Sequence, residues 1–413
     1  MISIPKDIRL PSMTFRSRLI LYALLTSLTS LSIDALLPGL RQIGLELGVA
    51  PPLSTHHVIS LFIFGMVFGE LVIGPFSDAF GRKRALLGGI CVYLLGTAIG
   101  LFAQSLEMVL IGRFLQGVGV SGPKIATRAM IRDQFEGDSM ARVMSFMFTL
   151  FILVPMLAPA LGQGLIAVAG WRSVFVAYLV IALGLGGWLF IRHPETLPAE
   201  RRIPLRPRLL MWNAARILSS ARVTMLILAT GLVFGAQLLY LSTAADLFFE
   251  AYGVAETFPF YFAALAISMG LASFLNAKLV QRLGAVTMVR TGLIGLSAVS
   301  LLMVVVNVAS GGALPFKAFL SLLFCAFFAI GILFGNLNAL TMQTLGSLAG
   351  FGASLIASGS SLVATLFALG YGSCYSGDTA YLAHGFLAAA LSSLILCEIA
   401  MTRKAEPIAG VDR

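Results

Sequence analysis

The chain has 413 residues, of which 58% are hydrophobic and only 11% are charged, whereas a soluble domain carries roughly 25% charged residues. That composition excludes a soluble protein, because too few polar side chains are present to cover a water-exposed surface. The net charge of +10 does not indicate nucleic-acid binding, because the basic residues stand between apolar segments. We therefore expect an all-α integral membrane protein that contacts membrane lipids and no nucleic acid.

Twelve apolar segments are each long enough to cross a bilayer, which takes about 20 helical residues. An arginine- and proline-rich stretch separates them into two groups of six, which predicts an N-terminal six-helix bundle over 1–195, a cytoplasmic linker over 196–222 and a C-terminal six-helix bundle over 223–413. The predicted spans lie near 17–38, 55–74, 85–103, 107–126, 141–165, 171–191, 223–245, 257–276, 285–307, 317–340, 351–371 and 379–401.

Basic residues are concentrated on one side of this predicted topology. They occupy the N-terminus, alternate loops, the linker and the C-terminus, and only Arg41, Arg172 and Lys317 fall on the opposite side. Because cytoplasmic loops carry an excess of lysine and arginine, both termini are predicted to be cytoplasmic. The first span is expected to stay in the mature protein, since no small-residue cleavage site follows it.

Two ionisable residues lie inside predicted spans, where a charge is costly and is usually retained for function. Asp34 lies four residues before Pro38 in the first span, and Arg113 lies six residues after Glu107 in the fourth. At 1.5 Å per residue both lie roughly 6–9 Å below the outer surface, so we expect them to be partners. Burial disfavours the ionised carboxylate and a nearby guanidinium favours it, so moving Arg113 would switch the protonation of Asp34. This predicts a proton-coupling pair; the alternative is a static ion pair that only orients two helices.

Further polar residues share these two helix faces. Ser30, Ser27 and Thr26 lie on the face of Asp34, and Gln116 lies beside Arg113. We therefore expect both helices to face a polar region.

The segment 74–84 predicts a cytoplasmic turn between the second and third spans. Its two glycines and its proline favour a tight turn, its aspartate is expected to cap the next helix or to pair with an arginine, and its Arg-Lys-Arg run is expected to bind anionic headgroups. From composition alone, the alternative is a generic positively charged loop. The residues assigned to this loop are Gly74, Asp78, Gly81, Arg82 and Lys83.

The fifth span contains Pro155, Pro159 and Gly162, which remove backbone donors and side-chain bulk from a helix interior. This pattern fits a helix that bends during transport, or one that simply packs closely. Glu70, near the cytoplasmic end of the second span, and Asp246, near the outer end of the seventh, are secondary acidic candidates that solvent is able to reach.

Several other patterns are interpreted as structural. The residues Gly117 to Gly122 match GxGxxG, but no strand precedes them, so we expect a small-residue packing face and not a dinucleotide site. His56 and His57 are adjacent, point about 100° apart on a helix and have no third ligand nearby, so no metal site is expected. The four cysteines are scattered and predict no disulfide. Without a phosphate-binding loop or a catalytic nucleophile, we expect a protein that is not an enzyme, needs no cofactor and uses a proton gradient as its energy source.

Together these residues resemble the major facilitator superfamily over essentially the whole chain. The segment 74–84 is similar to its GxxxDxxGRKR loop, and residues 113–117 are similar to its RxxQG motif. Residues 155–164 look like a degraded antiporter motif, in which Ala158-Pro159 replaces the usual Gly-Pro pair.

Finer features resemble the bicyclomycin-resistance (Bcr/CflA) type of drug:proton antiporter. These are Asp34, Arg132-Asp133, Gly170-Trp171-Arg172 with Phe175, the run from Pro194 to Leu197, and the run from Gly350 to Ser354. The resemblance implies that Asp34 is a proton or substrate carboxylate, that Arg113 is its partner, and that Asp78 and Arg82 belong to a cytoplasmic gate.

The expected function is a monomeric, proton-coupled secondary transporter that exports a lipophilic compound across the bacterial inner membrane by alternating access. A proton-coupled importer, or an exporter of one specific metabolite, is the alternative. An intramembrane enzyme would show a nucleophile or metal triad, and a receptor would show a soluble module; neither is evident. The substrate cavity is expected between the two bundles, lined by Ser30, Gln116, Gln237, Tyr240, Asn336 and Asn338.

Overall fold

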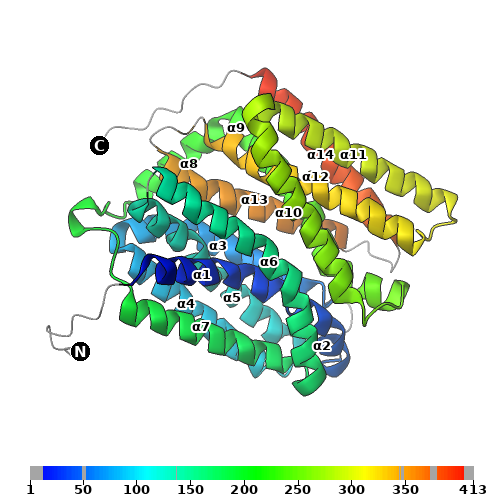
Figure 1. The fold of residues 1–413 in the computed structure, drawn as a ribbon, viewed down its shortest axis with the longest axis horizontal. Helices are drawn as coiled ribbons and strands as arrows, with labels where there is room; N and C mark the ends of the chain where they lie inside the picture. Colours follow the sequence, from blue (N-terminus) through cyan, green and yellow to red (C-terminus); the bar gives the residue numbers. More distant parts are fainter. Residues whose placement is uncertain are drawn as a thin grey trace.

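A computed structural model describes residues 13–48, 53–135, 137–343, 345, 348–372 and 379–403, with side chains between 137 and 152 described only at Val143 and Met147. Within these residues the regular structure is helical throughout. Helices α1 to α7 pack together on one side of the molecule and α9 to α14 on the other, as Figure 1 shows.

The first group follows the chain order closely. It comprises α1 (Phe15–Asp34), η1 (Leu37–Gly39), α2 (Leu40–Glu46), α3 (His57–Phe80), α4 (Arg82–Leu101), α5 (Leu106–Gln134), α6 (Gly137–Ala169) and α7 (Arg172–Arg192). The linker that follows contains the short turn η2 (Ala199–Arg201) and the helix α8 (Pro207–Ser219), which the sequence reading did not predict.

The second group begins directly after the linker. It comprises α9 (Ala221–Asp246), the π-helical turn η3 (Leu247–Ala251), α10 (Phe258–Leu283), α11 (Ala285–Ala309), α12 (Phe316–Met342), α13 (Ala349–Gly372) and α14 (Thr379–Thr402). In Figure 1 the start of α1, the helix α8 and the end of α14 lie at the same end of the molecule.

Ten helices of the described chain are long and apolar enough to cross a membrane, so the protein is a multi-pass membrane protein. The sequence predicted twelve spans, and the two not among the ten correspond to α5 and α6. α5 has 29 residues, or about 43 Å, but its many polar side chains lower its hydropathy. In α6 the side chains described from Leu153 onward form the apolar stretch Leu153–Ala169, and most of the side chains before it lie outside the described residues.

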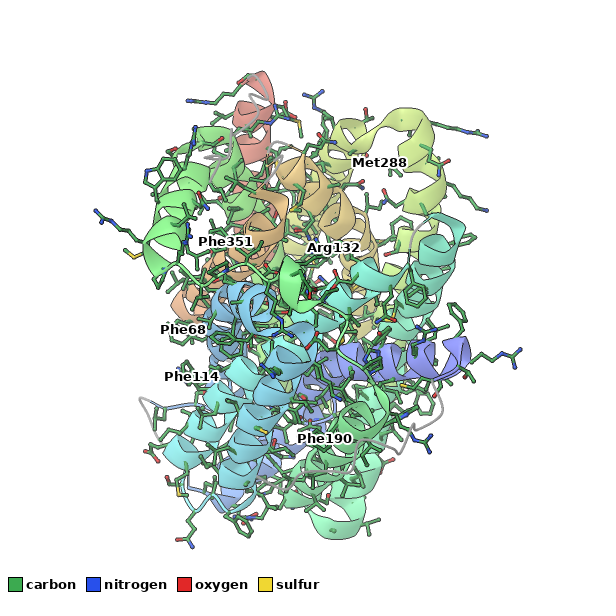
Figure 2. All side chains as sticks on the ribbon, turned by 90° about the vertical axis from the view of Figure 1, so that its left-hand side faces the viewer. Phe68, Phe114, Arg132, Phe190, Met288 and Phe351 are labelled. Atoms are coloured by element: carbon green, nitrogen blue, oxygen red, sulfur yellow. The ribbon has the colours of Figure 1, made fainter. Side chains whose placement is uncertain are left out.

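Figure 2 looks onto the end of the molecule where the linker lies and shows how the outer surface is built. Phe68 and Phe190 are exposed large apolar side chains on this surface, and Phe114 lies beside Phe68 with a ring-centroid distance of 5.7 Å. Exposed apolar side chains are expected on helices that face lipid.

The turn predicted over residues 74–84 is wrong in its extent, because α3 continues to Phe80 with Pro75 inside it and α4 begins at Arg82. Only Gly81 separates α3 from α4, and its φ of +106° is one that glycine adopts without strain. Gly284, with a φ of +79°, has the same place between α10 and α11. The two glycines therefore play equivalent parts in the two halves of the chain.

The predicted packing face in α5 is confirmed by the close approach of backbones. A Cβ atom on Gly117 would lie 1.9 Å from the carbonyl oxygen of Phe62 in α3, and one on Gly119 would lie 2.2 Å from the amide nitrogen of Tyr93 in α4. Small residues that allow such contacts hold membrane helices together where lipid supplies no hydrophobic driving force.

Candidate functional site

Asp34 is the last residue of α1, and its side chain is buried at 6% exposure. Among the described residues, no side chain or backbone group makes a hydrogen bond or ion pair to its carboxylate. Tyr178 in α7 and Tyr240 in α9 are both within electrostatic reach of it, and η1, which follows directly, contacts α9. Asp34 therefore lies close to the junction of the two helix groups.

Arg113 is fully buried inside the first helix group. Its Nε donates to the carbonyl oxygen of Val58 (3.2 Å), its Nη1 donates to Oε1 of Gln116 (2.8 Å), and its guanidinium lies 4.3 Å from the ring centroid of Phe62. The Nη2 atom is buried without a partner in the described part of the chain.

The expected ion pair between Asp34 and Arg113 is absent from this conformation. Among the described residues, no carboxylate oxygen lies within 4.0 Å of a guanidinium nitrogen of Arg113. Gln116 is held in turn by its Nε2, which donates to Oγ1 of Thr97 (2.8 Å). Equal depth in the membrane does not fix the direction in which a side chain points. Arg113 points toward α3 and α4, whereas Asp34 lies nearer to α7 and α9.

The remaining predicted cavity residues do not form one cluster. Ser30 lines a small pocket between α1 and α6, together with Thr26 and Ser27. Asn336 is buried and donates through Nδ2 to Oδ1 of Asn276 (2.6 Å), whereas Asn338 is exposed.

Tyr240 and Gln237 project from α9 into different surroundings. Tyr240 is fully buried, its ring lies against Phe262 and Phe327, and its hydroxyl has no hydrogen-bond partner among the described residues. Gln237 is half-buried and donates to the sulfur of Met269 (3.8 Å). Of the predicted set, the structure brings Tyr240 near Asp34 at the junction of the two groups.

One face of α3 carries contacts to the second helix group along most of the helix. Residues 56, 60, 67, 70 and 74 are spaced so that they share this face, which we call the α3 junction face. At 1.5 Å per residue it extends about 27 Å, close to the thickness of a bilayer core. Sequence reasoning did not find this face, because its members differ in polarity.

The N-terminal end of the α3 junction face contacts α9. Nε2 of His56 lies 3.2 Å from Oδ2 of Asp246, its Nδ1 lies 2.7 Å from the carbonyl oxygen of Ser242, and the hydroxyls of Ser60 and Ser242 are 3.4 Å apart. Asp246 was expected to be solvated, but its side chain is only 23% exposed and paired. His56 is thus the partner of an acidic side chain.

Two more polar contacts join the two helix groups. Nε of Arg41 lies 3.7 Å from Oε1 of Glu250, with both side chains more than half exposed. Gln163 in α6 donates through Nε2 to the carbonyl oxygen of Ala255 (3.4 Å).

The C-terminal end of the α3 junction face contacts α13. Ser358 donates to the carbonyl oxygen of Val67 (2.8 Å), and Ser361 donates to Oε2 of Glu70 (3.0 Å). The other carboxylate oxygen of Glu70 pairs with Lys124 of α5. Glu70 is fully buried, so the expectation that solvent reaches it is wrong.

The same end also shows how closely α3 and α13 approach. A Cβ atom on Gly74 would lie 2.2 Å from Oγ of Ser354. Gly74 therefore serves helix packing and not a turn.

The basic run after Gly81 is held by acidic residues of the first group. Arg82 is buried, its Nε donates to Oδ2 of Asp133 (3.0 Å), and its Nη1 pairs with Asp78. Of the two roles predicted for Asp78, capping the next helix or pairing with an arginine, the structure shows the pairing. The expectation that Arg82 binds headgroups is wrong, because its guanidinium is used inside the protein.

The start of α4 is capped by Glu195 and not by Asp78. Oε1 of Glu195 accepts from the amide of Arg82 (2.9 Å), and Oε2 accepts from the amide of Lys83 (3.2 Å). An anion at this position satisfies amide groups that a helix leaves unpaired. Before the structure was known, Glu195 and Asp133 had no predicted role beyond their place in the family resemblance.

The predicted residues of α6 lie within one helix. Pro155 and Pro159 are inside α6, which continues through both to Ala169. A Cβ atom on Gly162 would lie 1.9 Å from the carbonyl oxygen of Ala35, the residue after Asp34. Gly162 therefore lets α6 approach the backbone beside the buried acid, and whether α6 bends during transport stays a prediction.

The chain matches the Major Facilitator Superfamily over residues 22–368. It is 31% identical over 271 residues to a bicyclomycin resistance protein homolog of Haemophilus influenzae, covering 65% of this chain and 68% of that protein. It is 30% identical over 224 residues to the multidrug resistance protein MdtL of Citrobacter koseri, covering 54% and 55% of the two chains.

Solved structures support the fold alone. The peptide transporter POT in complex with sulfate gives a TM-score of 0.74 at 12% identity, covering 97% of this chain and 98% of that one. The xylose transporter XylE from E. coli gives 0.69 at 10% identity, covering 93% and 96%.

Proposed function

Because the chain belongs to the Major Facilitator Superfamily, we propose that it is a proton-coupled secondary transporter that exports lipophilic small molecules by alternating access. It is a transporter and not an enzyme. The proposed topology has twelve crossings, with α5 and α6 added to the ten apolar helices, and places both termini in the cytoplasm of a bacterial inner membrane. The two groups of helices would act as the six-helix bundles of residues 1–195 and 223–413, joined by the linker 196–222.

The observation that carries the proton-coupling proposal is the isolation of Asp34. A buried carboxylate without a cation is stabilised by taking up a proton, because the charged form loses its solvation without gaining a partner. Exposure to the outer side would offer protons to this group, and exposure to the inner side would release them. Its position near the junction of the two helix groups suits both steps.

Arg113 would act on Asp34 at a distance in this conformation. One of its N–H groups is buried and unpaired, and Tyr178 lies within electrostatic reach of both charges. A movement of α1 against α5 that brings the guanidinium toward Asp34 would favour release of the proton.

The contacts along the α3 junction face support alternating access. The His56–Asp246 contact must break for the outer side to open, and the Glu70–Ser361 contact must break for the inner side to open. Such exchange of one set of contacts for another is what rigid-body rocking of two bundles requires.

The substrate class is proposed from the surroundings of Asp34 and from the relatives. Tyr240, Phe262 and Phe327 form an aromatic cluster near the acid, which suits an apolar ligand that carries few polar groups. Relatives bear the names bicyclomycin resistance and multidrug resistance. Import, or export of one specific metabolite, is the alternative, because the same scaffold serves either direction.

A susceptibility panel in a bacterial host that lacks its own efflux pumps tests this proposal. Expression of the chain should raise resistance to at least one lipophilic compound, and a protonophore should abolish the difference in cellular accumulation. Unchanged resistance to every compound, with the protein present in the membrane, would remove the drug-export proposal and favour the metabolite alternative.

A further inference from the structure

The linker between the two helix groups is strongly basic. From residue 201 to residue 222 it contains no aspartate or glutamate, and its arginines are Arg201, Arg202, Arg206, Arg208, Arg216 and Arg222. An uncompensated positive charge of this kind at the membrane surface attracts anionic headgroups.

Helix α8 within this linker has one face on the protein and another that the protein leaves uncovered. Ile217 is fully buried against the second helix group, in a cluster with Ile227 and Ile356. On the uncovered face Met211 is 74% exposed and Trp212 is 46% exposed. Leu209 and Leu218 are exposed as well.

The uncovered apolar face of α8 does not belong to a membrane span. α8 has 13 residues, or about 20 Å, which is too short to cross the hydrocarbon core. A short helix with apolar and basic residues on its exposed surface is instead typical of one that lies in the membrane interface.

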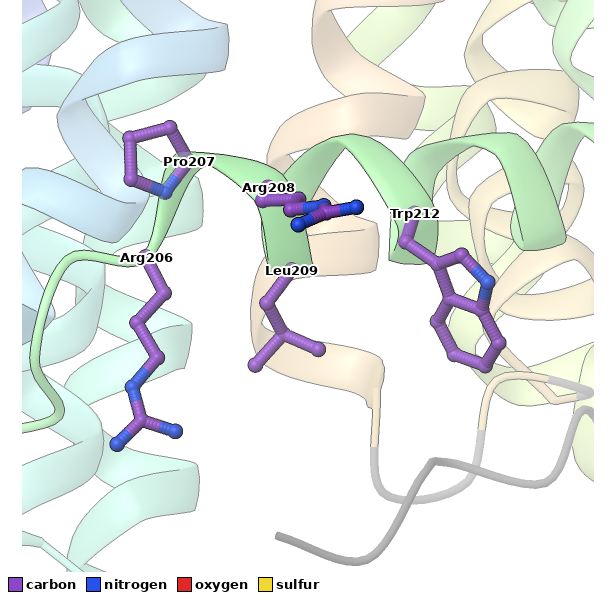
Figure 3. A pocket seen from close by; sticks show the side chains of 5 residues that line it. All are labelled: Arg206, Pro207, Arg208, Leu209 and Trp212. Carbon is purple, nitrogen blue, oxygen red and sulfur yellow. The ribbon is translucent and has the colours of Figure 1, made fainter.

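The start of α8 forms an open hollow of about 530 Å³, lined by Arg206, Pro207, Arg208, Leu209 and Trp212. Figure 3 shows Arg206, Leu209 and Trp212 pointing to the same side of the helix. The guanidinium of Arg216 lies 5.0 Å from the ring centroid of Trp212. Positively charged guanidinium groups and the apolar side chains of Leu209 and Trp212 therefore lie next to one another in this hollow.

We propose that this hollow binds an anionic phospholipid, with the headgroup phosphate at Arg206 and Arg208 and the acyl region against Leu209 and Trp212. Guanidinium groups recognise phosphate oxygens through paired hydrogen bonds. The unpaired amides of the first turn of α8 add to the attraction, although Pro207 at the first position has no N–H to contribute.

The bound lipid would hold the linker against the cytoplasmic end of α3. The amide of Ile203 donates to the carbonyl oxygen of Asp78 (3.1 Å), and Asp78 pairs with Arg82. The linker is therefore joined both to the first group, at Asp78, and to the second, at Ile217.

Quenching of Trp212 by brominated lipids tests the site in the full-length protein in nanodiscs. The signal of Trp212 is the difference between the wild type and Trp212→Phe, because Trp171 and Trp188 also fluoresce. Brominated phosphatidylglycerol should quench this signal at least about twofold more than brominated phosphatidylcholine at the same mole fraction. Inorganic phosphate added in solution should leave the preference unchanged.

The double variant Arg206→Gln with Arg208→Gln should lose the preference. The matched control, Arg84→Gln with Arg282→Gln, removes two exposed arginines elsewhere and should keep it. Equal quenching by the two lipids, or a preference that free phosphate removes, would overturn the proposal. Absence of quenching by both lipids would also overturn the proposal. If the protein were then found to be a dimer, the uncovered face of α8 would be assigned to contact with a second copy of the chain.

Discussion

Oε2 of Glu70 accepts a 3.0 Å hydrogen bond from Ser361, and this contact joins α3 to α13 across the junction of the two helix groups. Because the other oxygen of the same carboxylate pairs with Lys124, one buried acid links three helices. In the proposed transport cycle, opening of the inner side would require exchange of the bond to Ser361, whereas the pair with Lys124 lies within the first group and would persist.

The first prediction concerns the stability supplied by Glu70. Glu70→Ala should lower the free energy of unfolding by about 3 kcal/mol, because it leaves the ammonium of Lys124 without its anion in a largely buried site. Ser361→Ala removes a single hydrogen bond and should cost about 1 kcal/mol. Thermal unfolding in detergent measures both, and equal losses in the two variants would contradict the assignment.

The second prediction concerns the outer contact between His56 and Asp246. Asp246→Ala should shift the conformational equilibrium toward an open outer side by about 1 kcal/mol, or roughly fivefold. Maleimide labelling of a cysteine at Ser242, in a chain freed of its native cysteines, should become faster by that factor. Glu250→Ala, which removes the exposed contact to Arg41, serves as the control and should change the rate little. Identical rates in the two variants would argue against an outer latch.

The third prediction concerns the close approach of α6 to α1. Gly162→Ala places a methyl group against the carbonyl oxygen of Ala35 and should cost about 1–3 kcal/mol of stability. Gly164→Ala, two residues further on, meets no atom within 4 Å and should be close to neutral. Melting temperatures of the two variants give the comparison. If they match, the contact beside Asp34 does not constrain the two helices.

The fourth prediction concerns pH and His193, which lies just after α7. Burial lowers the pKa of His193 below its usual value of 6.5, with Lys83 and Arg18 adding to the effect. The neutral ring makes two hydrogen bonds. Its Nδ1 donates to the carbonyl oxygen of Pro194 (2.7 Å), and its Nε2 accepts from the hydroxyl of Tyr22 (2.6 Å).

The sign of the pH effect follows from the lowered pKa. Between the lowered value and 6.5 the unfolded chain binds a proton that the folded chain does not, so stability falls as the pH falls below 6.5. Melting curves from pH 7.5 downward should show a smaller loss for His193→Gln than for the wild type. An unchanged slope would mean that His193 does not contribute.

The fold could be predicted from the sequence because apolar segments and basic loops report directly on the bilayer. The ends of helices could not: Pro75 suggested a turn, yet α3 runs to Phe80, since one glycine with a positive φ suffices to reverse the chain. Helix α8 was not predicted because its apolar residues do not share one face. Ile217 is buried against the protein, whereas Met211 points away from it.

The candidate site was predictable only in part. Asp34 stands out as an acid within an apolar segment, and its burial agrees with that expectation. The direction of Arg113 depends on tertiary packing, which spacing along one helix does not reveal. The polar partners of α3 were missed for a similar reason, since Ser358 and Ser361 lie almost 300 residues away in the chain.

The central claim is that Asp34 carries the transported proton. Inverted membrane vesicles with a preformed proton gradient, followed with a pH-sensitive dye, test it most directly with a compound identified in the susceptibility panel. Addition of the compound should release part of the gradient in the wild type. With Asp34→Asn the release should be absent although the compound still binds, whereas Asp34→Glu should retain part of it. Undiminished release with Asp34→Asn would contradict the account.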